Sequence, residues 1–188
     1  MKLVIGVLIA LLLVGLVVGG KAVGTYNELA TQREAIKGAW AQVDNVLQRR
    51  ADLLPNLVET VKGFAKQEEK VFGEIAQARA AMAGARTPAE RIDANSRIEG
   101  ALGRLLVVAE SYPQLKSSEN FSRLQDELAG TENRIAVERK KYNETVQRYN
   151  TELVRFPNNM IGGVFGFQRE DAYFKTDPAK REVPPVKF

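Results

Sequence analysis

The chain has 188 residues, with 27 basic and 23 acidic side chains, and it contains neither cysteine nor histidine. Because both residue types are missing, disulfides, thiolate metal sites, cysteine nucleophiles, zinc-protease helices, Ser-His-Asp triads and Glu-x-x-His di-iron bundles are excluded. The formal net charge of +4 arises from charges of both signs that are well mixed along the chain. This balance argues against the basic stripe of a nucleic-acid binder, so no nucleic acid is expected as a partner.

The first element in chain order is the uncharged run LVIGVLIALLLVGLVVGG, residues 3–20. About 18 apolar residues are enough to cross the hydrocarbon core of a bilayer. A cleaved signal peptide usually has a shorter apolar region, of about 7–15 residues, followed by a small-x-small cleavage site. The sequence therefore favours a retained membrane anchor over residues 1–24, with the lipid bilayer as the partner of residues 3–20.

The orientation of such an anchor follows from the basic residues near its two ends. Lys2 and the amino terminus lie on one side, whereas three basic residues lie within about 20 positions on the other side: Lys21, Arg33 and Lys37. This excess predicts a single-pass protein whose short N-terminus lies outside the cell and whose main domain is cytoplasmic.

After the anchor, apolar side chains recur every three or four positions from residue 25 to residue 156. This is the period of one helix face, whereas a strand would alternate with a period of two. We therefore expect an all-α protein, with an N-terminal transmembrane helix followed by an antiparallel four-helix-bundle-like domain of long amphipathic helices over residues 25–174. Residues 175–188 are polar and proline-rich, and we expect them to form a disordered tail.

Local signals mark two breaks in this helical pattern. In GARTPAE, Thr87 can act as an N-cap, Pro88 as the first helical residue and Glu90 as the capping-box partner. A second break falls at Tyr112-Pro113, and the last long helix is expected to begin near residue 117.

Pro55, in RRADLLPNLVETVKGFA, leaves two possibilities open. A proline inside a helix costs about 3 kcal/mol or more, because it removes a hydrogen bond and clashes with the preceding turn. The apolar pattern stays in phase across Pro55, which favours a kink in one helix. Helices of similar length would instead result from a break that separates residues 26–54 from 56–83. A reversal of the chain needs loop residues, and no cluster of turn residues surrounds Pro55.

Arg49 and Arg50 are the first candidate site. Arg50 occupies a position on the apolar face, so we expect its stem to pack in the bundle and its guanidinium to pair with Glu138 or Glu132 on a facing helix. The alternative is that both arginines bind an anionic partner or a lipid headgroup. About 42 Å of straight helix separates them from the membrane end, and lipid charge is screened within about 10 Å, so the structural role is favoured.

The segment FPNNMIGGVFGF, residues 156–167, is the second candidate, with Phe165 and Phe167 among six large apolar residues. It can fold back to cap the bundle, or it can remain exposed as an apolar docking element for a membrane or a partner. The capping role is the favoured interpretation.

Carboxylates are numerous, but neither a fixed spacing nor a glycine-rich loop gathers them, and no Walker-type phosphate loop is present. We therefore expect no catalytic, metal-binding or cofactor-binding residues, and the chain is predicted not to be an enzyme.

Three long blocks, residues 26–65, 102–150 and 156–174, resemble the LemA family. The resemblance implies a bacterial membrane protein with one N-terminal transmembrane helix, a four-helical bundle and a short N-terminus outside the cell. Some relatives act in magnetosome membrane formation. The resemblance assigns no catalytic residue to this chain.

The sequence thus predicts a membrane-anchored, non-enzymatic helical-bundle protein that acts by self-assembly or by binding a membrane-protein partner. Self-association is expected because long apolar stripes can pair between chains, as in a coiled coil, as well as within one chain. One alternative is a carboxylate-based hydrolase or ligand-binding enzyme, and a second is an anionic-lipid or nucleic-acid binder.

Overall fold

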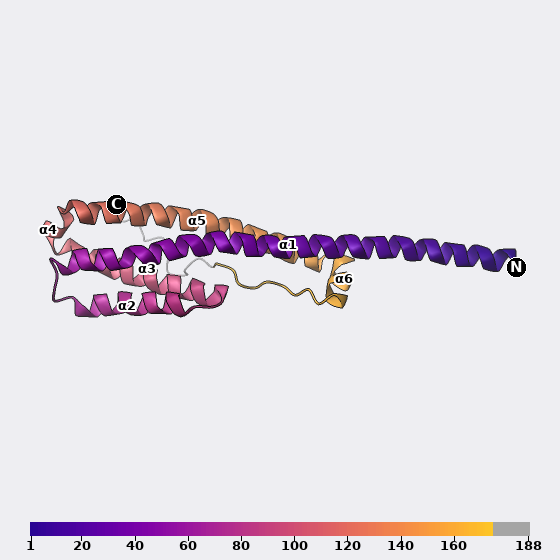
Figure 1. Cartoon of the computed structure of the whole chain (residues 1–188), viewed down its shortest axis with the longest axis horizontal. Helices are drawn as coiled ribbons and strands as arrows, with labels where there is room; N and C mark the ends of the chain where they lie inside the picture. Colours follow the sequence, from indigo (N-terminus) through magenta and orange to yellow (C-terminus); the bar gives the residue numbers. More distant parts are fainter. Residues whose placement is uncertain (175–188) are drawn as a thin grey trace, which may run out of the picture. The chain divides into compact units, whose positions relative to one another are not determined.

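The computed structural model describes residues 1–174, in which every regular element is a helix (Figure 1). The predicted all-α fold, with an apolar N-terminal helix and long amphipathic helices after it, is confirmed. The predicted disordered tail, residues 175–188, lies outside the described residues. The elements are α1 (Lys2–Lys62), α2 (Glu69–Gly84), α3 (Pro88–Glu110), α4 (Pro113–Lys116), α5 (Glu119–Val154) and α6 (Asn158–Val164).

Pro55 lies inside α1, which continues without interruption to Lys62. The possible break at Pro55 is therefore wrong, and the helix that continues through the proline is the form that the structure adopts. The chain instead leaves the helix over residues 63–68, where Ala65 donates a backbone hydrogen bond of 2.9 Å to Val61 before α2 begins at Glu69.

The non-helical segment also changes which residues face the core. The apolar pattern of the sequence included Phe64 and Val71, but Phe64 is 44% exposed and Val71 is only half-buried. Ala65 and Phe72 are buried instead. This shift follows because residues 63–68 do not advance by the 100° per residue of a helix, so the phase of α1 does not carry over to α2.

The start of α3 is the capping box that the sequence predicts. The backbone N–H of Glu90 donates to Thr87 Oγ1 at 3.2 Å, and the backbone N–H of Thr87 donates to Glu90 Oε2 at 3.2 Å. The backbone N–H of Arg86 also donates to Glu90 Oε2, at 2.6 Å. These donors, that of Arg86 first, hold the pKa of the Glu90 carboxyl below its usual value because they stabilise the ionised form.

The chain divides into two compact units. Unit one consists of residues 1–39 and 144–171, and unit two consists of residues 40–143 and, of the described chain, residues 172–174. Unit two contains α2, α3 and α4 and has a core of aliphatic and aromatic residues. Its fully buried large side chains include Leu47, Leu54, Leu57, Met82, Ile98, Leu105, Leu115, Phe121, Ile135 and Tyr142.

Unit one contains the apolar N-terminal part of α1. Its length and composition make it a candidate membrane span, and none of the apolar stretch is buried against the described protein. Water would hydrate this side-chain surface unfavourably, whereas lipid tails solvate it well.

Two asparagines on α5 hold the chain that follows α6. In unit two, Asn143 donates to the carbonyl of Phe174 at 2.9 Å and accepts from its N–H at 3.0 Å. In unit one, Asn150 makes the same pair of bonds with Glu170, at 2.7 and 3.0 Å. These side chains satisfy backbone groups that have no helix or sheet partner, so an irregular segment keeps a fixed path.

Replacing Thr87 with alanine should lower the free energy of unfolding by about 1 kcal/mol, because an N-cap hydroxyl is lost. Urea unfolding of the full chain in detergent micelles, followed by circular dichroism, measures this change. Ser96→Ala is the matched control on the same helix. Ser96 Oγ only donates to the Ile92 carbonyl in mid-helix, so its removal should change stability by less than about 0.5 kcal/mol. Equal losses in the two variants would contradict the capping role.

Candidate functional site

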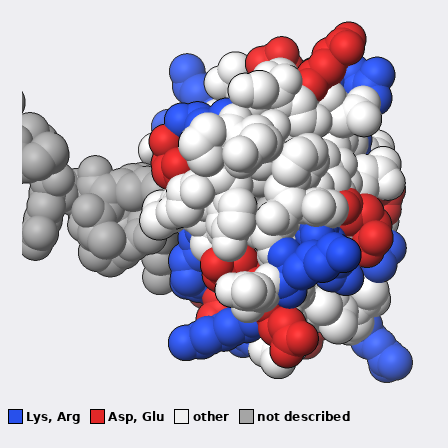
Figure 2. All heavy atoms as spheres, turned by 90° about the vertical axis from the view of Figure 1, so that its left-hand side faces the viewer, with Lys and Arg blue, Asp and Glu red and all other residues white. Residues whose placement is uncertain are grey.

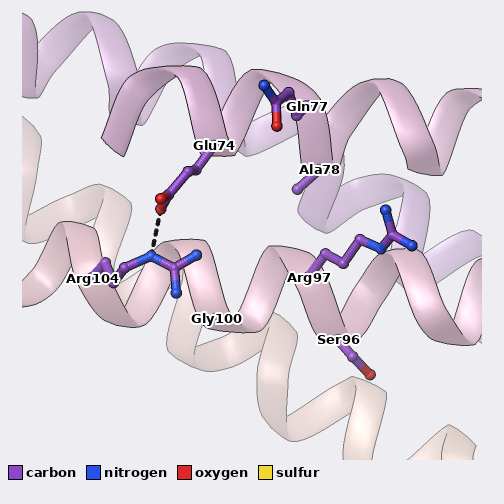
Figure 3. Close-up of a pocket in the computed structure, with 7 residues that line it drawn as sticks. All are labelled: Glu74, Gln77, Ala78, Ser96, Arg97, Gly100 and Arg104. Carbon is purple, nitrogen blue, oxygen red and sulfur yellow. Dashed lines mark hydrogen bonds and ion pairs between the residues drawn. The ribbon is translucent and has the colours of Figure 1, made fainter. Parts of the chain in front are cut away.

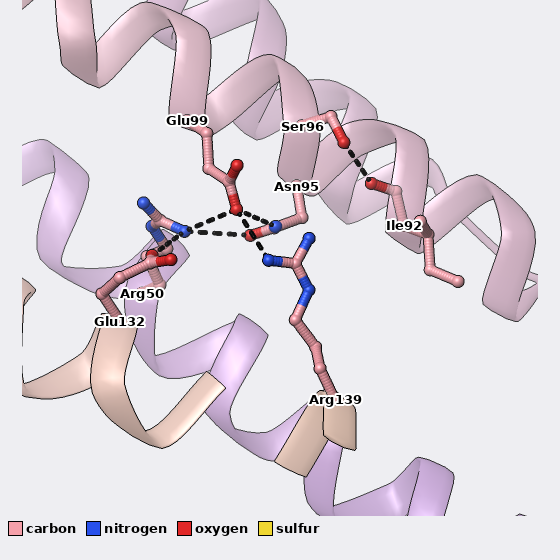
Figure 4. A network of polar contacts seen from close by, with 7 residues as sticks. All are labelled: Arg50, Ile92, Asn95, Ser96, Glu99, Glu132 and Arg139. Carbon is pink, nitrogen blue, oxygen red and sulfur yellow. Dashed lines mark hydrogen bonds and ion pairs between the residues drawn. The ribbon is translucent and has the colours of Figure 1, made fainter. Parts of the chain in front are cut away.

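Arg50 is the buried charge of unit two, with 7% of its surface exposed. Its Nη1 atom lies 2.8 Å from Glu132 Oε2 on α5 and 3.5 Å from Glu99 Oε1 on α3 (Figure 4). It also donates to Asn95 Oδ1 at 3.3 Å. One guanidinium from α1 therefore joins α3 and α5, which is the seam position that the sequence predicts.

The contact between Arg50 and Glu132 is electrostatic rather than a well-directed hydrogen bond, because Glu132 Oε2 has no hydrogen-bond partner among the described residues. The Glu132 side chain is 41% exposed as a whole, but Oε2, the oxygen that faces Arg50, is buried, so the contact itself is shielded while the rest of the side chain is hydrated. The Nε atom of Arg50 is buried and also has no hydrogen-bond partner in the described part of the chain. The guanidinium is thus well neutralised in charge but incompletely satisfied in hydrogen bonds.

Glu99 links this arginine to a second one. Asn95 Nδ2 donates to Glu99 Oε1 at 2.9 Å, and Arg139 Nη1 on α5 donates to the same oxygen at 3.2 Å (Figure 4). The network therefore contains two guanidiniums and two carboxylates, and its formal charges cancel. Balanced charge is the condition under which a buried ionic group is tolerated.

An aromatic group continues the network. The Arg139 guanidinium lies 4.7 Å from the ring centroid of Phe174, within the range of a cation–π contact. Tyr142 meets Phe174 edge-on at 6.0 Å and Trp40 edge-on at 5.4 Å, measured between ring centroids. Polar contacts on one side and aromatic contacts on the other therefore fix Arg139.

The structure separates the other residues that the sequence singles out. Arg49 is exposed on the surface of α1, next to the buried Arg50. Glu138 does not pair with Arg50 and instead accepts a bond of 2.7 Å from Lys141 on its own helix. Of the two expected partners, Glu132 is the one in contact. Any interaction role of Arg49, Pro55 and Glu138 stays a prediction.

Phe165 and Phe167 lie together in unit one. Both rings meet Tyr26 edge-on, at centroid distances of 5.1 and 5.6 Å. Beside them, a shallow pocket of about 270 Å³ is lined in part by Arg33 and Tyr149.

Tyr149 is the perturbed group of this pocket. Burial raises the pKa of its hydroxyl, and the positive charge of Arg33 partly opposes that rise. The hydroxyl donates to the backbone carbonyl of Gln168 at 2.7 Å, so it is engaged in holding the chain after α6.

A further hollow, of about 450 Å³, lies between α2 and α3 (Figure 3). Glu74 and Arg104 form an ion pair across it, and the remaining lining residues are mostly small or polar. Within residues 1–174, no group of three carboxylates gathers as a metal site would require. On the face of unit two in Figure 2, acidic and basic side chains alternate rather than form a patch of one sign.

Sequence reasoning missed Asn95, Glu99 and Arg139 as members of the network, and it missed Asn143 and Asn150. Asn95 carried a usable signal, because it lies three positions after Ile92 and three before Ile98, on the apolar face of the predicted helix, and the structure buries it there. Glu99 and Arg139 carried no such signal, since charged residues on helices are common at partly exposed positions.

The fold and the network define an all-helical protein with a candidate N-terminal membrane span and a bundle joined by a buried ionic contact. The family model of the LemA family matches residues 39–188, and the chain belongs to that family.

Curated relatives agree with this assignment. The chain is 27% identical to magnetosome protein MamQ 2 of Paramagnetospirillum magneticum over 180 residues, which covers 82% of this chain and 66% of the relative. It is 25% identical to magnetosome protein MamQ of Magnetospirillum gryphiswaldense, with the same coverage. Protein LemA of Metamycoplasma hominis is 24% identical over 140 residues, covering 74% of this chain and 64% of that protein. The chain thus spans slightly less than two thirds of the length of these relatives.

Replacing Arg50 with methionine should lower the free energy of unfolding by about 3 kcal/mol, near the lower end of the range for breaking a buried ion pair. The lower end applies because Glu132 is partly hydrated and Glu99 retains Arg139. Arg49→Met is the matched control, since its side chain is exposed and its loss should cost less than about 0.5 kcal/mol. Chemical unfolding of the full chain in micelles measures both. Similar values for the two variants would show that the network contributes nothing to stability.

Proposed function

We propose that this protein is a single-pass membrane protein that acts without catalysis, by self-assembly or by binding a membrane-protein partner. The observation that carries the proposal is the continuity of α1. One helix, Lys2–Lys62, supplies both an exposed apolar stretch long enough to cross a bilayer and side chains that are buried in the helical bundle. A helix of this kind suits a protein that presents a bundle at a membrane surface.

The arrangement of the charged residues supports a non-catalytic role. A general acid or base needs a carboxylate whose proton can reach a substrate. Glu99 and Glu132, which the structure brings together, instead face Arg50 and compensate its charge. Glu74 similarly pairs with Arg104.

The relatives give further support. Two of them are named as magnetosome proteins, and the family resemblance implies that some relatives act in magnetosome membrane formation. Transfer of a membrane role to this chain is part of the proposal, as is the membrane contact of residues 3–20.

The proposed orientation places the bundle in the cytoplasm and the short N-terminus outside. Lys21 together with Arg33 and Lys37 follows the apolar stretch, whereas only Lys2 and the terminal amine precede it. An excess of basic residues usually remains on the cytoplasmic side.

Self-assembly is tested with two copies of the full chain that carry different tags and are expressed together. If the chain assembles, capture of one tag from membranes in mild detergent should recover the other. If it binds a membrane-protein partner instead, crosslinking in native membranes before solubilisation should give a discrete heavier adduct. Mixing the two tagged copies only after solubilisation is the control for association in detergent. Recovery of monomers alone in both experiments would contradict the proposal.

Orientation is tested with Val107→Cys, which gives the chain a single thiol at a position that is 71% exposed on α3. In intact cells, a membrane-impermeant maleimide should not label this thiol, because the proposed location is cytoplasmic. Labelling should appear once the cells are permeabilised. A cysteine placed directly after Met1 is the opposite control and should react in intact cells. The reverse pattern would place the bundle outside.

A further inference from the structure

The chain around α6 exposes large apolar side chains. Phe156 is 80% exposed, Met160 64%, Val164 82% and Phe165 52%. No charged residue occurs from Phe156 to Phe167. Large apolar side chains that are exposed together in this way usually mark a site that contacts a membrane or another protein. We call these four exposed residues the α6 patch.

The two faces of α6 differ. Asn158 and Gly162, one turn apart, face the protein, because Asn158 accepts a hydrogen bond of 3.2 Å from Thr25 Oγ1 and Gly162 is buried. Met160 and Val164, also one turn apart, lie on the exposed face. The short helix is therefore amphipathic in its contacts even though it carries no charge.

Gly162 explains how closely α6 approaches its neighbours. A Cβ atom at this position would lie 2.6 Å from Leu153 Cδ1 and 3.5 Å from Leu29 Cδ1. A larger residue would therefore require the Leu153 side chain to shift, and Gly166, with φ of +74°, then turns the chain so that Phe167 returns to Tyr26. Close packing on one face leaves the side chains of the other face fixed outward.

The position of α6 along α1 places the patch next to the proposed span. Its contacts on α1 are Thr25, Tyr26 and Leu29. Thr25 follows the last residue of the apolar run, Gly20, by about 7.5 Å of helix. The headgroup layer on each side of the hydrocarbon core is about 5–7.5 Å thick, so Thr25 lies at the outer edge of that layer if the apolar run ends where the hydrocarbon core ends. In Figure 1, α6 lies beside α1 and is steeply inclined to it, and the N-terminal part of α1 extends beyond α6.

We propose that the α6 patch is a second membrane contact, which lies in the interfacial layer beside the α1 span. The occupant is the lipid bilayer, because the patch carries no charge and its contacts on α1 begin only about 7.5 Å beyond the end of the apolar run, at the outer edge of the headgroup layer. Aromatic residues such as Phe156 and Phe165, together with aliphatic ones, suit this layer. The absence of charge predicts that the contact does not depend on anionic lipid or on salt. This proposal rests on the membrane anchoring proposed above.

The test uses the full chain reconstituted into phosphatidylcholine vesicles, with one cysteine at Met160 or at Val164 carrying an environment-sensitive fluorophore. The sequence contains no cysteine, so each introduced thiol carries the only label. Vesicles contain nitroxide quenchers attached either at the headgroup or deep in the acyl chain. Val14→Cys reports on the span, and Val107→Cys, which is 71% exposed on α3, reports on a surface in water.

Labels at Met160 and Val164 should show blue-shifted emission and several-fold stronger quenching by the headgroup nitroxide than by the deep one. The Val14 label should show the opposite preference, and the Val107 label should respond to neither. The pattern should persist in vesicles that contain phosphatidylglycerol and in high salt.

The outcomes distinguish the two proposals. If Val14 is quenched by the deep nitroxide while Met160 and Val164 are not quenched, the α6 contact is wrong and the anchor stands. If Val14 is not quenched at all, the anchor itself is wrong. If the blue shift at Met160 and Val164 appears only at high protein-to-lipid ratio, a second copy of the chain covers the patch, and the bilayer contact is overturned. Circular dichroism of each variant verifies that the helices are intact.

Discussion

The positive charge of Arg50 has to be neutralised inside the bundle, and much of the arrangement of unit two depends on how this is done. The guanidinium reaches α3 through Asn95 and Glu99 and reaches α5 through Glu132. A shift of any of these helices by one turn, about 5.4 Å, would leave a charge buried without its partner. Such a loss costs more than the pair gains, and we infer that the network acts mainly against wrong registers of the helices rather than as a source of net stability.

The network also reaches the chain that follows α6. Glu99 holds Arg139, whose guanidinium lies over the ring of Phe174, and Asn143 fixes the backbone of that same residue. Phe174 therefore has three kinds of contact: a cation, an amide and neighbouring aromatic rings. An irregular segment without helix or sheet bonds needs such side-chain partners to keep one path. The ion pairs and the path of this segment are parts of one connected set of contacts.

Local features of the sequence predicted the elements well. Contacts that depend on the register between helices could not be predicted in this way. The capping box at Thr87 and Glu90 is contained in four residues, so it could be recognised without knowledge of the fold. The choice between Glu132 and Glu138 as partners of Arg50 could not, because they differ by about 9 Å along α5 and by about 120° around it, and only the axial position and rotation of that helix decide between them. Pro55 presented the same difficulty, since the lengths of the helices favoured a break at the proline, whereas the chain leaves the helix only after Lys62.

The segment after α5 shows why two interpretations of one sequence can both hold. Capping of the helices and exposure for docking look like alternatives when the residues are considered together, yet they concern different faces of α6. Gly162 and Asn158 pack inward and fix the helix against α1, whereas Met160 and Val164 remain outside. Fixing the inner face would favour the proposed lipid contact of the outer face, because an ordered apolar surface can bind without first losing conformational entropy. The position of that surface just beyond the apolar run of α1 then makes the boundary of the proposed membrane, rather than the protein interior, its natural environment.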